Sequence, residues 1–125
     1  MVKKHPIYPQ RIRKVPRQFS WIDQRLVREH YIDRCSHSAA TLYLFLVTVA
    51  DAQGMSYYGE RSICRRLAMD EKDLEKARQE LIGLELIAWQ RPLYQVLAIG
   101  ASTSPRPSGN LQCLAQVLQG IGGAP

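Results

Sequence analysis

The stretch RRLAMDEKDLEKARQEL, from Arg65 to Leu81, is typical of two helices that meet at a tight corner. Asp70 stands at this corner and is a favourable N-cap, because its carboxylate can accept hydrogen bonds from backbone N–H groups that a helix start leaves free. After it, Leu74, Ala77 and Leu81 recur at helical spacing and define one apolar face. Helices joined so closely bury their apolar faces by packing at an angle around a common core, which restricts the fold of the whole chain.

A longer and more apolar segment, CSHSAATLYLFLVTVADAQG, precedes this pair. It begins with a ready N-cap at Ser36 or Ser38 and ends just before Gly54. Its apolar residues cover more than one helical face, so we expect a central and mostly buried helix. These residues are Leu42, Leu44, Phe45, Leu46, Val47 and Val49.

Shorter patterns predict the remaining elements. FSWID alternates apolar and polar residues like a short strand, and Asp23 can cap a short helix over residues 24–27. MSYY indicates a short extended piece, and residues 60–67 indicate a helix. LIAWQRPLYQVLAI holds two apolar-rich strands around a tight turn at residues 90–92, which predicts a β-hairpin. The predicted class is therefore α+β and helix-rich.

The order of these elements resembles the winged helix-turn-helix domains of bacterial regulators and of plasmid or phage replication initiators. Such domains often read LAxxLGVSxxTVxxALxxLxxxGLI, and the similarity covers roughly residues 20–99. The matching residues here are Ile63-Cys64, Leu67-Ala68-Met69-Asp70, Leu74, Ala77, Leu81 and Leu86-Ile87. The chain is also similar to small winged-helix proteins encoded beside bacterial transposable elements. This resemblance implies a three-helix core with a β-hairpin wing.

Three residues depart from the family pattern. Ala68 replaces the glycine of the turn, which alanine tolerates if its φ stays negative. Arg78 occupies a position that is usually apolar, where its stem could snorkel along the edge of the core. Glu85 stands where glycine often closes the helix, so the exit into the wing could be strained.

The net charge of +6 lies entirely in the first residues of the chain. Six basic residues and no acidic ones precede Phe19, whereas the remainder holds 11 basic and 11 acidic residues. The basic residues are Lys3, Lys4, Arg11, Arg13, Lys14 and Arg17. With three prolines between them, residues 1–18 should form an extended basic arm. Such an arm binds phosphate backbones or merely increases solubility, and charge alone does not separate the two.

The helix after Asp70 carries four carboxylates, which is unexpected for a helix that binds a polyanion. At about 100° per residue, the face opposite the apolar one presents Lys72, Lys76 and Gln79, with the carboxylates beside it or in the first turn. Lysines at i and i+4 repel each other, and a phosphate or guanine edge between them would remove that cost. The alternative is a solvated helix with Asp73–Lys76 and Lys76–Glu80 ion pairs.

The resulting prediction is a winged helix-turn-helix domain at residues 19–99 that binds double-stranded DNA. The expected contacts are Lys72, Lys76 and Gln79 on the second helix, Arg61 and Arg65 on the first, Arg91 in the wing, and Arg11, Arg13, Lys14 and Arg17 in the arm. The protein would be a transcriptional regulator or an accessory factor, for example of a mobile element. The alternative is a protein-interaction adaptor that uses the same scaffold in a transposition or replication complex.

Residues after the domain predict a linker and a contact element. Residues 100–110 are rich in Gly, Ser and Pro, which indicates a flexible linker. In residues 111–125, an apolar stripe at helical spacing predicts a short amphipathic helix that contacts its own domain, a second copy or a protein partner. The stripe consists of Leu111, Leu114, Leu118 and Ile121.

Other functional classes find little support in the sequence. No nucleophile elbow, paired catalytic carboxylate or Gly-rich phosphate loop stands out, so we expect no enzymatic activity, catalytic residue or cofactor. His30, Cys35 and His37 match no standard zinc spacing, and we expect no metal. Trp21, Trp89 and Tyr94 should build the core and wing. Three scattered cysteines, the absence of a signal sequence and an apolar run too short for a membrane predict a cytoplasmic protein.

Overall fold

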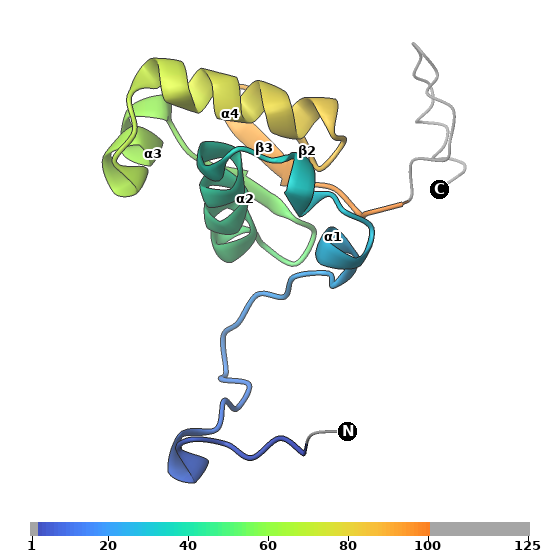
Figure 1. Ribbon diagram of the computed structural model, residues 1–125. Helices are drawn as coiled ribbons and strands as arrows, with labels where there is room; N and C mark the ends of the chain where they lie inside the picture. The colour runs from blue at the N-terminus through green and yellow to red at the C-terminus, as the bar shows by residue number, and fades with distance from the viewer. Residues whose placement is uncertain (1–2, 101–125) are drawn as a thin grey trace, which may run out of the picture.

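The computed structural model describes residues 3–100 of the chain. An extended N-terminal arm leads into a helical half, and a three-stranded sheet with two further helices follows (Figure 1). The helical elements are η1 (Pro9–Arg11), α1 (Arg25–Arg28), η2 (Ile32–Arg34), α2 (His37–Val49), α3 (Glu60–Leu67) and α4 (Glu71–Gly83). The strands are β1 (Met55–Tyr57), β2 (Ile87–Gln90) and β3 (Leu93–Val96). The predicted α+β, helix-rich class is confirmed. The predicted linker and C-terminal helix lie outside the described residues.

Helix α2 is the central element, and its start follows the predicted cap. The Ser36 side chain accepts a hydrogen bond from the backbone N–H of Ala39 at 3.1 Å. Leu42 and Leu46 are fully buried, but Leu44 is 55% exposed. The predicted burial therefore holds for one face of the helix, and the opposite face reaches the surface.

The sheet is antiparallel with strand order β1-β3-β2. The predicted hairpin is confirmed, with Trp89 opposite Tyr94 and the turn at Arg91 and Pro92. β1 adds to the outer edge of β3, where Ser56 lies opposite Tyr94. The bend before β1 requires glycine, because Gly54 has a φ of +85° and an added Cβ would lie 2.6 Å from the Val96 carbonyl oxygen.

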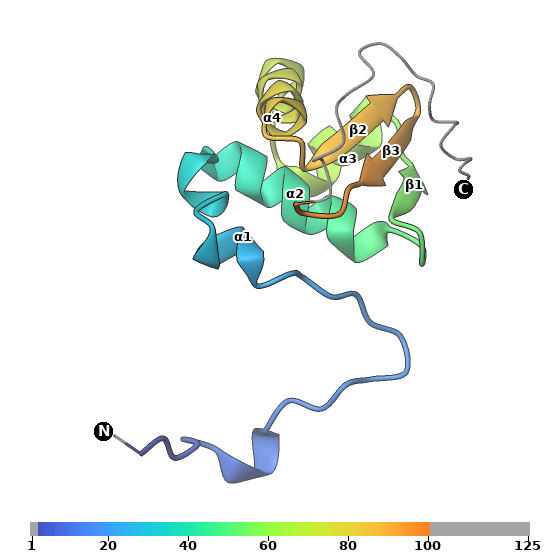
Figure 2. The ribbon, with the colours of Figure 1, turned by 90° about the vertical axis from the view of Figure 1, so that its right-hand side faces the viewer.

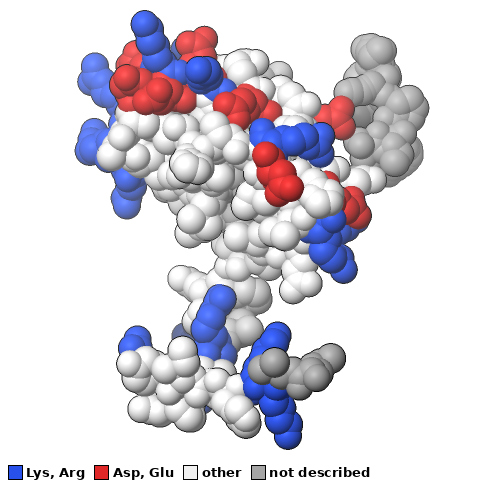
Figure 3. All heavy atoms as spheres, viewed as in Figure 1, with Lys and Arg blue, Asp and Glu red and all other residues white. Residues whose placement is uncertain are grey.

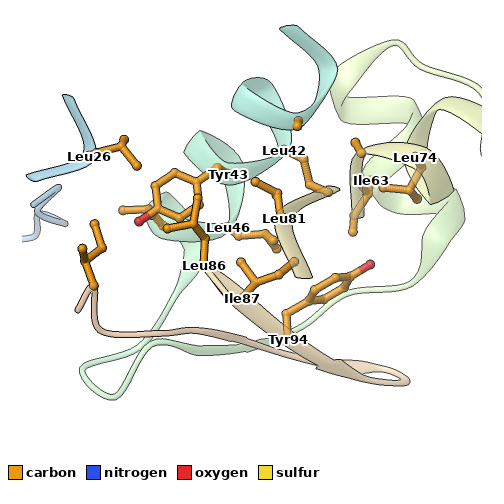
Figure 4. Close-up of a cluster of buried hydrophobic side chains, with 14 residues drawn as sticks. Leu26, Leu42, Tyr43, Leu46, Ile63, Leu74, Leu81, Leu86, Ile87 and Tyr94 are labelled. Carbon is orange, nitrogen blue, oxygen red and sulfur yellow. The ribbon is translucent and has the colours of Figure 1, made fainter. Parts of the chain in front are cut away.

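The hydrophobic core lies between α2, α3, α4 and one face of the sheet (Figures 2 and 4). α2 and α4 pack against each other, and each also contacts a strand of the hairpin. The largest fully buried side chains are Leu42, Leu46, Ile63, Leu74, Leu81, Leu86, Ile87 and Tyr94. Because all the larger elements contribute to this one cluster, the corner between α3 and α4 is held by the same packing that holds the sheet.

The strand predicted at residues 19–23 is wrong. Phe19 and Trp21 belong to no strand and are 61% and 73% exposed, so Trp21 does not build the core as expected. The short helix after them is confirmed one residue later than predicted, as α1. Asp23 is not its N-cap, which is Gln24 without a side-chain cap bond, but Asp23 Oδ1 accepts a 2.9 Å hydrogen bond from the Arg25 backbone N–H at the start of the helix.

None of the helices within residues 3–100 combines the length and the apolar character that a membrane crossing requires.

Candidate nucleic-acid interface

The corner between α3 and α4 is built from backbone hydrogen bonds and one carboxylate. Ala68 ends α3 in the left-handed region at φ +54°, so the condition under which alanine replaces the turn glycine without strain, a negative φ, is not met. This conformation lets the N–H groups of both Ala68 and Met69 reach the Cys64 carbonyl, the latter at 3.1 Å. Asp70 then caps α4 as predicted, since its Oδ1 accepts a 2.7 Å hydrogen bond from the Asp73 N–H. Three residues are therefore enough to turn the chain from one helix into the next.

Helix α4 presents the outward stripe that the helical wheel predicts. Leu74, Ala77 and Leu81 are buried, whereas Lys72 and Lys76 are exposed. Gln79 is exposed on the same outward side, and an added Cβ at Gly83 would meet nothing within 4 Å. The stripe thus offers two ammonium groups and one amide to solvent, with open space at its C-terminal end.

The carboxylates of α4 do not form the ion pairs that would neutralise this stripe. Glu80 instead turns toward α2, where its Oε1 accepts a 2.9 Å hydrogen bond from the Ser36 backbone N–H. A carboxylate is favourable there, because the start of a helix carries partial positive charge. Within residues 3–100, no carboxylate lies in ion-pair contact with Lys72 or Lys76. The alternative of a helix with Asp73–Lys76 and Lys76–Glu80 pairs is therefore not what the structure shows.

Helix α3 adds further cations beside the corner. Arg61 and Arg65, one turn apart, are exposed, and no ion pair joins either of them to a carboxylate of the described part of the chain. Arg66, which no sequence pattern marked as a contact, is also exposed and without an ion pair to a carboxylate of residues 3–100. Figure 3 shows Lys and Arg atoms together with Asp and Glu atoms over this end of the molecule. The corner is a mixed surface in which cations project outward among exposed carboxylates.

Arg91 in the hairpin turn is exposed but not free of a counter-charge. Its Nη2 lies 3.6 Å from Oε2 of Glu60, the first residue of α3. The same Glu60 oxygen accepts a 3.2 Å hydrogen bond from Nη2 of Arg78. The Glu60 carboxylate therefore contacts both Arg78 and Arg91. Because Arg91 already has this counter-charge, it is a weaker candidate for phosphate contact than the arginines of α3.

The prediction that Arg78 snorkels along the edge of the core is wrong. Its guanidinium does not snorkel to the surface, because the residue is only 4% exposed. Nη1 donates a 3.1 Å hydrogen bond to the Tyr94 hydroxyl, and the guanidinium carbon lies 3.7 Å from the centroid of the Trp89 ring. Burial raises the pKa of Tyr94, and the hydrogen bond from Arg78 partly opposes that rise. Arg78 therefore connects α4 to both strands of the hairpin and, through Glu60, to α3.

The basic arm lies apart from the α3–α4 corner. All residues from Lys3 to Arg17 are exposed, and η1 is the one helical turn within them. α2 lies between α4 and the arm in both ribbon views (Figures 1 and 2), so the structure does not bring the two groups of predicted contacts together. The arm shows Lys and Arg atoms without a carboxylate in Figure 3. The arm cations predicted to contact DNA are Arg11, Arg13, Lys14 and Arg17.

Side chains capable of holding a metal do not gather in the described residues. No group of three His, Cys, Asp or Glu side chains there is arranged to hold an ion. His30 instead contacts Asp33, with 3.1 Å between Nδ1 and Oδ2 at the surface. Burial raises the pKa of the Cys35 and Cys64 thiols, which disfavours the thiolate that metal binding needs.

Comparison of the chain with protein families, with curated proteins and with solved structures finds no match.

Proposed function

We propose that this chain is a non-enzymatic DNA-binding protein built as a winged helix-turn-helix. α4 would enter the major groove, and the β2–β3 hairpin would be the wing. A helix, a short strand, two helices joined by a three-residue corner and a hairpin follow one another in the order that this fold uses. The α+β architecture is compatible with it.

The observation that carries the proposal is the outward stripe of Lys72, Lys76 and Gln79 on α4, in which neither lysine is in ion-pair contact with a carboxylate of the described residues. Two nearby carboxylates accept hydrogen bonds within the domain: Glu80 from the Ser36 backbone N–H at the start of α2, and Glu60 from Arg78. Lys72 and Lys76 remain outward and adjacent on α4. Each phosphate bound by such a cation releases counterions from DNA, and this release drives much of the affinity. Gln79, next along the stripe, has the amide geometry that pairs with adenine in the major groove.

The arm would contribute separately, along the phosphate backbone or in the minor groove. Its cations lie on exposed and extended chain, so they can follow a duplex without repacking the domain. The protein would serve as a regulator or as an accessory factor, for example of a mobile element.

A second function, that of a protein-interaction adaptor, is favoured by the apolar side chains of the arm. Ile7, Ile12 and Val15 are 87%, 58% and 75% exposed between the cations. Phosphate contacts do not use such side chains, whereas an acidic protein groove would bury them. In that case the winged-helix scaffold would hold the arm for a partner in a transposition or replication complex.

Duplex binding measured by fluorescence anisotropy at two salt concentrations tests the proposal. The full chain should bind a random duplex at low salt, and the Lys72→Ala/Lys76→Ala variant should bind more weakly. Arg28→Ala is the control, because Arg28 is an exposed cation on α1, which lies away from α3 in both ribbon views (Figures 1 and 2). Because the double variant removes two positive charges and the control removes one, a loss of binding free energy in the double variant that is only twice that of the control would indicate that only total charge matters. No binding by the full chain at low salt would overturn the proposal and favour the adaptor.

A further inference from the structure

Where the arm joins the domain, large apolar side chains gather on the surface around two hollows. Phe19 and Trp21 border a hollow of about 580 Å³ that extends to Ile99. Phe19 also borders a second hollow of about 430 Å³ on the outer face of α2, together with Ile22 and Leu44. Because Phe19 borders both, the two hollows lie next to each other. We call Phe19, Trp21, Ile22 and Leu44 the root surface.

The root surface is too apolar to be ordinary surface. Its four side chains are 61%, 73%, 46% and 55% exposed. Single exposed apolar residues are common in soluble proteins, but a cluster beside a concave region marks a site that something covers. None of the four belongs to the α3–α4 corner.

The last described residues, 97–100, lie at the edge of the root surface. Leu97, Ala98 and Ile99 line the larger hollow with Trp21. Gly100 lies against α1, since an added Cβ there would be 3.2 Å from Nη1 of Arg25. The 25 residues that follow in the sequence therefore start next to the root surface.

The composition of those residues suits an apolar docking site. Arg106 is the one charged residue between 101 and 125, so the segment is neither strongly repelled by the basic arm nor attracted to it. The predicted stripe of Leu111, Leu114, Leu118 and Ile121 offers four large apolar side chains to one helical face. A helix of this length is marginal alone in water and needs such packing to form.

The intervening chain is long enough for the segment to fold back. The ten residues 101–110 are rich in Ser and Pro, and as a flexible chain they would span about 16–19 Å on average, or more where the prolines extend them. This covers the distance across a small domain face. A tether of that length gives an effective concentration of about millimolar. A second copy at micromolar concentration would therefore compete poorly for the same surface.

We propose that residues 111–121 form an amphipathic helix that packs on the root surface of the same molecule. Its stripe would cover Trp21 and Leu44 and fix the point at which the arm leaves the domain. α4 lies on the other side of α2 from the arm (Figures 1 and 2), so the docked helix would leave the Lys72–Gln79 stripe accessible. The proposed docking of residues 111–121 and the proposed DNA binding by α4 use different surfaces. An experiment can therefore overturn one proposal and leave the other intact.

Acrylamide quenching of tryptophan fluorescence tests the docking in the full-length chain. Leu114→Asp/Leu118→Asp should expose Trp21, giving a red-shifted emission and a higher quenching constant than the parent. Gln112→Asp/Gln116→Asp is the matched control, because it adds the same two charges on the side of the helical wheel away from the stripe, and it should leave the emission and the quenching constant unchanged. In a Trp21→Phe background the difference should vanish, because Trp89 would then be the only reporter.

A second measurement distinguishes docking of residues 111–121 from other causes of a change in tryptophan fluorescence. Amide hydrogen exchange should show protection of residues 111–121 in the parent and its absence in Leu114→Asp/Leu118→Asp. Parent chains without protection there, or with Trp21 as accessible as in the variant, would overturn the proposal. Protection that rises with protein concentration, with a dimer in sedimentation, would also overturn it and assign the root surface to a second copy.

Discussion

The guanidinium carbon of Arg78 lies 3.7 Å from the centroid of the Trp89 ring, so a buried cation of α4 stacks on an aromatic ring of the β2–β3 hairpin. Arg91, at the hairpin turn, approaches the same ring at 5.5 Å. A planar guanidinium can stack and still donate hydrogen bonds in its plane, which an ammonium cannot do. Arg78 uses both abilities, because it also reaches Tyr94 and Glu60.

Replacing Arg78 should therefore destabilise the domain even when side-chain volume is largely kept. Arg78→Met would leave Tyr94 and Glu60 without their donor, and we expect a decrease of about 1–3 kcal/mol in the free energy of unfolding. Arg78→Lys should also be destabilising, because lysine cannot reproduce the stacking on Trp89. Urea denaturation measures both decreases. Arg61→Met, at an exposed position of α3, is the control and should change stability by no more than about 0.5 kcal/mol. Equal stability of Arg78→Met and the parent would contradict the structural role assigned to the guanidinium.

The conformation of Ala68 predicts a stabilising substitution. Its φ of +54° is unfavourable for any residue with a Cβ, by roughly 1–2 kcal/mol. Ala68→Gly removes that strain but increases the entropy of the unfolded chain, so the net gain should be about 0.5–1 kcal/mol. The same change within α2, Ala40→Gly, should instead cost about 1 kcal/mol. Thermal unfolding of the two variants checks the contrast, and a lower melting temperature for Ala68→Gly would show that the corner is not strained.

Two leucines of α2 should respond differently to truncation. Leu46 is fully buried and Leu44 is 55% exposed, although both stand in the same helix. Leu46→Ala should cost about 2–5 kcal/mol, a large part of the total stability of a domain this small. Leu44→Ala should cost less, no more than about 1–2 kcal/mol, and the upper part of this range applies if residues 111–121 dock over Leu44. Chemical denaturation of both variants gives the comparison, and similar costs would mean that the two faces of α2 are assigned wrongly.

Asp23 should make stability depend on pH in acid. Hydrogen bonds from the Arg25 side chain and, secondarily, from its backbone N–H hold the pKa of this carboxyl below its usual value. The charged form is thus favoured in the folded state, so its contribution is complete above the ordinary carboxyl pKa of about 3.9. It disappears as pH falls through the lower pKa of the folded state.

Urea denaturation of the parent and of Asp23→Asn between neutral pH and pH 2 tests this dependence. The stability difference between them should shrink toward acid. In an Arg25→Ala background the difference at neutral pH should be smaller, because the main cause of the pKa shift is gone. If the difference in unfolding free energy between the parent and Asp23→Asn stays constant down to pH 2, the charge of Asp23 does not contribute to stability.

The helix bounds could be predicted because local chemistry fixes them. Ser36 and Asp70 cap α2 and α4 with their own side chains, and the signal for each cap lies within four residues. The strand predicted at residues 19–23 failed for the opposite reason. Alternation in FSWID describes a residue pattern, but a strand exists only when another strand pairs with it, and β1, β2 and β3 pair among themselves.

Of the candidate interface, the sequence could predict only those side-chain positions that follow from helical periodicity. The outward positions of Lys72, Lys76 and Gln79 follow from the buried spacing of α4. The partner of Glu80 does not, because Ser36 is 44 residues earlier in the chain. Arg78 could have been suspected, since an arginine in an apolar helical register needs partners. Only the structure shows that these are Glu60, Trp89 and Tyr94.

Mutations in the arm and mutations in α4 should change DNA binding in different ways, because the two segments lie on different sides of α2. Neutralising the six arm cations with glutamine removes charge that can reach phosphates of any sequence. Binding should weaken similarly on every duplex, and the log–log salt slope should shrink by up to about 0.9 for each phosphate that the arm no longer neutralises. Anisotropy titrations over a range of salt concentrations measure this slope.

Lys72→Ala and Gln79→Ala instead remove groups that the proposed docking directs at base edges. A good bidentate base contact contributes roughly 1–3 kcal/mol of discrimination, so these variants should weaken preference for a selected site more than affinity for random duplex. Site selection with the parent, followed by titration of all three variants on the selected and random duplexes, separates the two effects. If the α4 variants keep the site preference of the parent while the arm variant abolishes all binding, α4 does not read DNA. The domain would then act as a scaffold for the arm, as the adaptor function requires.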